Sequence, residues 1–177
     1  MNALNRFLME STDIDTAKEK GGRRQSVKVF IIKDKSKILY LRIQEGCGGA
    51  GRWDLPGGGI EPNETQKDAV AREVKEETSL KITNIKKLRE KNGKLDIPET
   101  GVHSDWIFYI ADAENSDVVM NPSEWSKLEG HPEHNEYKWV EEEWQLDQMD
   151  MCEDFKRIGK KLLKKFKNQK NTNKSKI

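Results

Sequence analysis

A run of glycines followed at once by a glutamate-rich helical segment constrains this chain more than any other feature. Residues 55–80 read LPGGGIEPNETQKDAVAREVKEETSL. Thr65 followed by Asp68 has the pattern of a helix N-terminus, although a start two residues earlier, at Asn63, competes with it. The helix is expected to run to about Thr78. The glycines permit backbone conformations that are closed to other residues and leave peptide groups free to face a ligand.

Three glutamates of that helix converge on one side. At about 100° per residue, Glu73, Glu76 and Glu77 fall within about one third of the helix circumference, beside an apolar seam formed by Val70 and Val74. Like charges at these spacings repel one another. A neutralising cation explains the cluster, and carboxylates without His or Cys suit a hard ion such as Mg²⁺ or Mn²⁺. Such an ion keeps open positions for phosphates, which a loop without side chains lets approach.

The same residues resemble the Nudix box, the signature of the Nudix hydrolase (MutT-like) superfamily. Ser79 stands where that pattern has its last glycine, which usually ends the helix in a left-handed conformation. We expect this departure to affect the local turn rather than the chemistry. A chance match of this length is rare. The matching positions are Gly58, Glu64, Arg72, Glu73, Val74, Glu76, Glu77 and Leu80.

The resemblance implies a hydrolase that cleaves a nucleoside diphosphate linked to another group, using divalent cations and an attacking water. It implies that Arg72 orients the carboxylates through a charge pair, with Glu64 as its partner. Gly58 and Gly59 are the substrate-facing glycines. The implied metal ligands are Glu73, Glu76, Glu77 and the carbonyl of Gly57.

The general base has more than one candidate. Some family members use the glutamate after the box arginine, here Glu73, and others use an acid from a later loop. HPEHNEYKWV (131–140) resembles the segment before a late family strand, which makes Glu133 the first outside candidate and Glu136 the second. A solvated loop is an equal alternative for both.

Two further features in or near that segment are candidate ligand contacts. Trp125, in the irregular stretch 121–132, is the aromatic expected to face the substrate. His131 and His134 flank Glu133, but two histidines without further ligands do not favour zinc.

The pattern of strands and helices predicts a mixed α/β architecture. Strands outnumber helices and a hairpin precedes the first long helix, so a doubly wound sheet fits less well. With the resemblance, we expect a Nudix-fold α/β/α sandwich with a mixed sheet, plus a C-terminal amphipathic helix over 152–166. Expected strands are 27–33, 37–43, 53–55, 81–88, 106–113 and 136–140. The expected regions are an N-terminal arm or short helix (1–24), the hydrolase domain (25–166) and a basic, disordered tail (167–177).

Composition and charge limit the cellular location and the binding partners that we expect. The chain has 32 Lys and Arg residues against 31 Asp and Glu residues, so its net charge is close to zero. The total charge therefore does not indicate nucleic acid as a partner. The isolated Cys47 and Cys152 and the lack of a run of about 20 apolar residues favour a soluble, cytoplasmic protein without a membrane partner. Residues 156–177 hold bases and no acid, a run that could attract RNA, but the solvated face of a helix is the favoured interpretation.

These observations lead to one expected function and two alternatives. The leading expectation is hydrolysis of a small nucleotide, either a nucleoside triphosphate or a nucleotide sugar. An RNA 5′-end pyrophosphohydrolase is supported only by the basic run. A non-catalytic nucleotide or RNA sensor on the same fold is disfavoured by the intact box. The oligomeric state is open, with a homodimer as one option.

Overall fold

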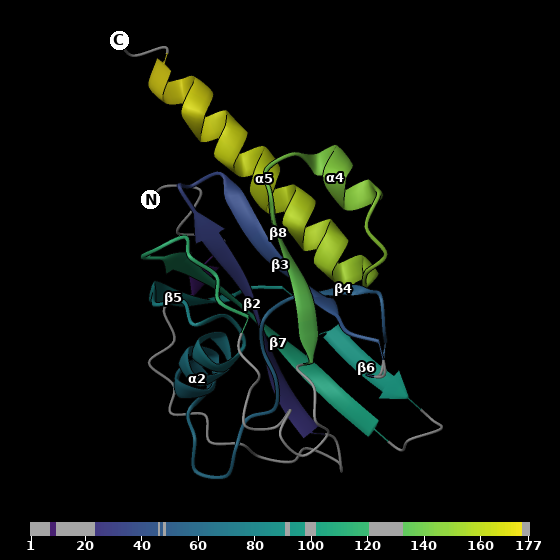
Figure 1. Cartoon of the computed structure of the whole chain (residues 1–177). Coiled ribbons are helices and arrows are strands. Elements are labelled where there is room, and N and C mark those ends of the chain that lie inside the picture. The colour runs from purple at the N-terminus through teal and green to yellow at the C-terminus, as the bar shows by residue number, and fades with distance from the viewer. Residues whose placement is uncertain are drawn as a thin grey trace.

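A computed structural model of the chain describes residues 8–9, 24–45, 47, 49–90, 93–97, 102–120 and 133–174. These residues form one mixed sheet whose strand order is β1-β5-β7-β2-β3-β4, with β6 added to β7 and β8 added to β3 (Figure 1). β2 and β7 run parallel, and the other pairs are antiparallel. The strands are β1 (Leu8–Met9), β2 (Arg24–Lys33), β3 (Lys37–Ile43), β4 (Trp53–Asp54), β5 (Ile82–Leu88), β6 (Gly93–Ile97), β7 (Val102–Ala113) and β8 (His134–Val140); the helices are α2 (Gln66–Thr78), α4 (Glu143–Asp147) and α5 (Glu153–Lys174).

Every strand expected from the sequence is present, and three elements were not expected. β1, β6 and α4 lack the long apolar patterns on which the sequence predictions depended. Of the predicted N-terminal arm, Leu8–Met9 is described as a short strand paired with β5. Trp125 and His131 lie outside the described residues.

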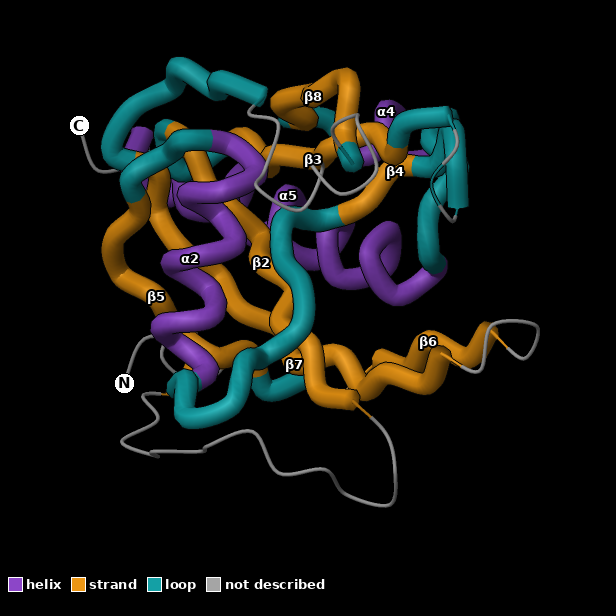
Figure 2. Tube along the Cα trace, turned by 60° about the horizontal axis from the view of Figure 1, so that its bottom comes forward, coloured by secondary structure: helices purple, strands orange, loops and turns teal. Residues whose placement is uncertain are grey.

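The apolar side chains of β2 alternate between the two faces of the sheet, and each face carries its own hydrophobic core. Successive side chains of a strand point to opposite faces. Val27 and Val29 therefore pack against α2, and Phe30 packs against α4 and α5. Figure 2 shows α2 in front of the sheet and α5 behind it. The expected α/β/α sandwich is confirmed.

The glycine loop lies between two strands that separate. β2 and β3 pair at only two positions next to their turn. Beyond these pairs, residues 53–60 fill the space between them. β4 pairs with β3, and on the other side the N–H groups of Val27 and Val29 donate to the carbonyls of Gly58 and Pro56, both at 2.9 Å. The loop is thus held by backbone hydrogen bonds on both sides.

Helix α2 begins and ends as the sequence predicts. The Thr65 hydroxyl accepts a hydrogen bond from the Asp68 N–H at 3.1 Å, which caps the N-terminus. Ser79 follows the last helical residue with φ 56°, and its N–H donates to the Lys75 carbonyl. The serine therefore adopts the left-handed conformation in which the family pattern has a glycine.

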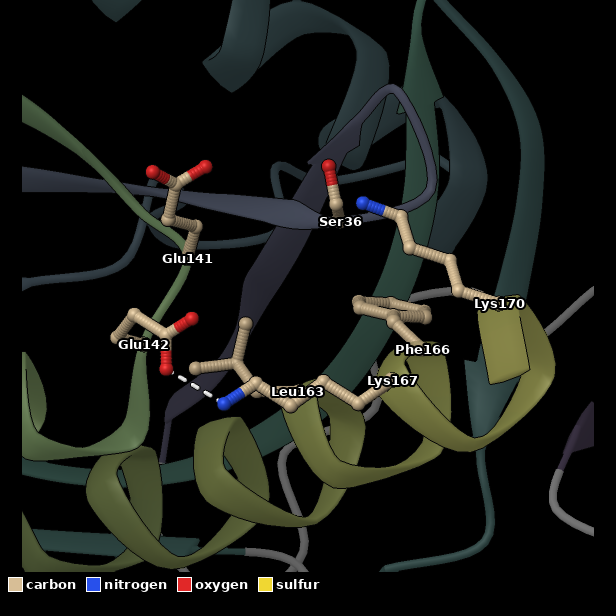
Figure 3. Close-up of a pocket in the computed structure, with 7 residues that line it drawn as sticks. All are labelled: Ser36, Glu141, Glu142, Leu163, Phe166, Lys167 and Lys170. Carbon is tan, nitrogen blue, oxygen red and sulfur yellow. Dashed lines mark hydrogen bonds and ion pairs between the residues drawn. The ribbon is translucent and has the colours of Figure 1, made fainter. Parts of the chain in front are cut away.

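Helix α5 is longer than expected. Residues 167–174 were expected to be disordered, but the helix continues to Lys174, so that prediction is wrong for them. The physical reason is pairing between the bases of α5 and the acids just before it. Lys167 donates to Glu142, as Figure 3 shows, and Lys164 lies 3.4 Å from Glu143. None of the described helices combines the length and apolar character needed to cross a membrane.

Candidate active site

A cavity of about 270 Å³ opens beside the glycine loop and the outer side of α2. Its walls are the three glycines 57–59, the arginines Arg24 and Arg72, and five glutamates. The structure thus gathers, from separate parts of the chain, most of the residues that the sequence singled out. The glutamates are Glu61, Glu73, Glu76, Glu77 and Glu133.

Arg72 organises the acidic side chains around it. A guanidinium has five N–H donors. Nε and Nη2 donate to the two Glu64 oxygens at 2.8 and 2.9 Å, and Nη2 also donates to the Gly59 carbonyl at 2.9 Å. Nη1 donates to Glu73 at 2.9 Å and to Glu76 at 3.2 Å. The hydrogen bonds from Arg72 lower the pKa of Glu64, so this carboxylate stays charged.

The carboxylates of α2 have different environments. Glu77 is buried, and its Oε2 accepts from the Gly57 N–H at 2.9 Å. Burial raises the pKa of Glu77 well above its ordinary value, although Lys28 opposes the shift. Burial also raises the pKa of Glu73, against the attraction of Arg72. A divalent cation in this cavity would offset the cost of charging both groups.

Lys28 is a central residue that sequence reasoning missed. Its ammonium donates to Asp54 Oδ2 at 2.8 Å and to the carbonyls of Leu55 and Gly57 at 3.2 and 3.1 Å. Burial alone would lower the pKa of Lys28, but the charges of Asp54 and Glu77 outweigh it and the pKa is raised. The signal in the sequence is a lysine inside an apolar strand, which ordinarily indicates a solvent-facing position.

The Gly57 peptide is held from both sides. Its N–H donates to Glu77 and its carbonyl accepts from Lys28. Its φ is 135°, and a Cβ at this position would lie 2.1 Å from the Val27 carbonyl oxygen. A glycine is therefore required where the loop passes β2.

Arg24 is the second cation of the cavity and lies on its exposed side. Its guanidinium lies against Gly59, so close that a Cβ there would be 2.0 Å from the Arg24 Nη2. All the donors of Arg72 are engaged by the chain, whereas the Arg24 guanidinium has no hydrogen bond or ion pair with another described residue. Arg24 is thus the cation that can meet an incoming anion.

The candidates near β8 differ in placement. Glu133 lines the cavity, whereas the exposed Glu136 pairs with Arg42 at 2.9 Å outside it. His134 is buried, with Nδ1 3.7 Å from Glu77 Oε1. Burial lowers the pKa of His134 and favours the neutral imidazole.

A mixed sheet between helices, with a glycine loop facing converging carboxylates, defines the chain as an α/β/α-sandwich protein whose cavity is suited to a divalent ion and a phosphate group. A family model described as the NUDIX domain matches residues 22–164. The chain therefore belongs to the Nudix family, and the resemblance noted in its sequence is confirmed.

Relatives and solved structures agree with this assignment. An RNA pyrophosphohydrolase of Bartonella henselae is 29% identical over 135 residues, covering 67% of this chain and 76% of the relative. One of Erythrobacter litoralis is 30% identical over 127 residues, covering 63% and 72%. The crystal structure of a MutT protein from Methanosarcina mazei Go1 is 26% identical, with TM-score 0.58, covering 84% of this chain and 95% of that one. A NUDIX family hydrolase of Clostridium perfringens (21% identical, TM-score 0.61, covering 80% and 97%) shares the fold.

Proposed function

We propose that this enzyme hydrolyses the diphosphate linkage of a small nucleotide, either a nucleoside triphosphate or a nucleotide sugar, with Mg²⁺ or Mn²⁺. One observation carries the proposal: the glycine loop, the carboxylates of α2 and Glu133 line a single cavity that also contains Arg24, whose guanidinium has no partner among the described residues. Acids alone would repel a nucleotide. A bound divalent cation offsets the negative charge of these carboxylates and attracts the phosphates. Arg24 adds a direct contact for phosphate oxygens.

The donor set of the cavity fits a hard divalent ion. Glu73, Glu76 and Glu77 would hold it, together with the Gly57 carbonyl, whose second lone pair is not used by Lys28. When bound, such an ion neutralises charge on the phosphoryl oxygens and makes a water more acidic.

The side chains of the enzyme then have distinct tasks. Arg72 holds Glu73 and Glu76 in fixed positions through its hydrogen bonds. Arg24 binds a phosphate of the substrate. Water attacks phosphorus, the bridging oxygen leaves with the other phosphoryl group, and a carboxylate takes the proton of the water. We assign that carboxylate to Glu133, because Glu73 is engaged by Arg72 whereas Glu133 is exposed at the rim. Glu73 is the alternative base.

An RNA 5′ end is the second candidate substrate. The names of the Bartonella and Erythrobacter relatives favour it. The basic residues of α5 do not support an RNA substrate, because α5 covers the opposite face of the sheet from α2. Several of those bases are also paired with acids of this chain, among them Lys164 and Lys167. The small nucleotide is therefore the first choice.

A substrate panel tests the proposal. Nucleoside triphosphates, nucleotide sugars and a 5′-triphosphorylated RNA oligonucleotide would be incubated with Mg²⁺ or Mn²⁺, and the released phosphate, pyrophosphate and monophosphate measured. Small nucleotides should give the highest kcat/KM. A kcat/KM at least tenfold higher for the RNA would transfer the assignment to RNA ends, and turnover unaffected by EDTA would refute the metal.

Site variants complete the test. Glu76→Gln removes one charge facing the ion and should lower kcat on the order of 10²-fold. Glu114→Gln, an exposed glutamate outside the cavity, is the matched control and should leave kcat unchanged. Glu133→Gln should lower kcat and remove the acidic limb of the pH–rate profile. If only Glu73→Gln does so, the base is Glu73.

A further inference from the structure

We infer that His134 is a metal ligand, and that it forms with Glu77 and Glu133 a subsite of mixed nitrogen and oxygen donors that binds Mn²⁺ or another first-row transition metal in preference to Mg²⁺. The inference rests on the proposed function, in which this cavity holds a divalent ion. It adds a subsite beside the oxygen donors of α2 and a preference for the ion that occupies it. Glu133 gives one carboxylate oxygen to this ion and keeps the other to take the proton of the water.

The distances suit one shared ion. Glu77, Glu133 and His134 each offer a ligand atom, and these atoms all lie within 4.8 Å of one another. His134 Nδ1 is 3.7 Å from Glu77 Oε1, which is too long for a hydrogen bond. Two ligand atoms at about 2.0–2.2 Å from the same ion are themselves separated by roughly 3–4 Å, so the gap has the size that an ion would bridge.

Glu77 is fixed in the orientation that this subsite needs. Its Oε2 accepts the Gly57 N–H at 2.9 Å, so the carboxylate cannot turn freely. The other oxygen, Oε1, is the one that faces His134. One carboxylate therefore spans from the glycine loop to β8, and it can take part in ion binding on either side.

The burial of His134 is otherwise unexplained by the described residues. The side chain is 4% exposed, and its Nδ1, which faces Glu77 Oε1, makes no hydrogen bond with them. An imidazole nitrogen without a hydrogen-bond partner has a lone pair that it can give to a metal.

The chemistry of the donors sets the preference. Mg²⁺ selects oxygen ligands in near-octahedral geometry, whereas an imidazole nitrogen suits first-row transition metals, of which Fe²⁺, Ni²⁺ and Zn²⁺ bind it more tightly than Mn²⁺. The side chains of Glu73 and Glu76 offer oxygen alone and would accept either class of ion. The subsite with His134 discriminates between them.

Electron spin-echo spectroscopy of the Mn²⁺-loaded protein without substrate tests the inference directly. The wild type should show coupling of Mn²⁺ to ¹⁴N, and labelling its histidines with ¹⁵N should replace that signal. His134→Phe should abolish the coupling and weaken Mn²⁺ binding by about 10-fold or more, with less than about a threefold effect on Mg²⁺. Glu136→Gln, an exposed residue of β8 outside the cavity, is the control and should keep both properties.

The outcomes separate the two claims. Mn²⁺ that binds without nitrogen coupling, or with coupling that survives in His134→Phe, overturns the ligand assignment and leaves the proposed hydrolysis standing. No binding of Mn²⁺ or Mg²⁺ to the wild type would refute the metal-dependent function as well. If His134→Phe does not fold, the ¹⁵N-labelled wild type and His134→Gln decide the question.

Discussion

Lys28 offers the sharpest test of how the fold supports the cavity. Its ammonium is buried and has three oxygen acceptors, of which the Asp54 carboxylate is the nearest at 2.8 Å. Lys28→Met keeps the length and apolar stem of the side chain but removes its charge. Asp54, with a side chain only 17% exposed, then loses its cation and keeps one hydrogen bond, from the Leu55 N–H at 2.7 Å.

The expected loss of stability follows from that geometry. Removing one partner of a buried ion pair costs about 3–5 kcal/mol, because the other charge is left uncompensated. Asp54 retains some contact with water, which places Lys28→Met near the lower end, at about 3 kcal/mol. For a domain of this size such a loss lowers Tm by roughly 6–12 °C. Lys28→Met/Asp54→Leu, which removes both charges, should recover most of it.

Urea and thermal unfolding of these variants provide the measurement, with Lys67→Met on the exposed side of α2 as the control. Lys28→Met should also raise the KM for the divalent ion, because the Gly57 carbonyl loses the group that orients it. If Lys28→Met and Lys67→Met differ by less than about 0.5 kcal/mol, the ammonium must reach water and the reasoning is refuted.

Three further predictions use other parts of the structure. Ser79→Gly should raise the free energy of unfolding by about 0.5–1 kcal/mol. A residue other than glycine in the left-handed conformation costs about 1–2 kcal/mol, and part of the gain is lost because glycine gives the unfolded chain more conformational entropy. A lower Tm would contradict this. Arg157 and Lys161 lower the pKa of Glu90 despite its burial, so its contribution is present above its ordinary pKa and lost as pH falls through the lowered value. Glu90→Gln should therefore be less stable at pH 7 and show a shallower decline below about pH 5 in pH-dependent denaturation. Arg24→Gln should raise KM for a triphosphate about 10-fold, and Gly59→Ala should do the same by displacing the guanidinium; kinetics with an unchanged KM in both would exclude the phosphate contact.

Local patterns predicted most of the fold and the acidic helix. The runs of β-branched residues form strands, and Glu73, Glu76 and Glu77, whose spacing predicts that they share one side of the helix, line one cavity. Such patterns depend on neighbours along the chain, which a sequence displays. The Arg72–Glu64 pair followed from the family resemblance in the same way.

The missed features depend on contacts between distant segments. Lys28 reads as a surface residue until the loop that carries Asp54 is placed beside β2. In the sequence, His134 is one of two histidines that flank Glu133 without further ligands nearby. In the fold, β8 places it beside Glu77, a residue of α2. The continuation of α5 beyond residue 166 is not visible in the sequence because Lys167 pairs with Glu142, an acid of the segment that precedes the helix. None of these pairs has a periodic pattern.

The insertion of residues 53–60 between β2 and β3 limits how this enzyme can move. A free surface loop can swing over its substrate, but this one is hydrogen-bonded to strands on both sides. Displacing it would require the sheet to open along two ladders at once, against two packed cores. The floor of the cavity is therefore rigid, and any adjustment to substrates of different size must come from long side chains at the rim, such as Arg24 and Glu133.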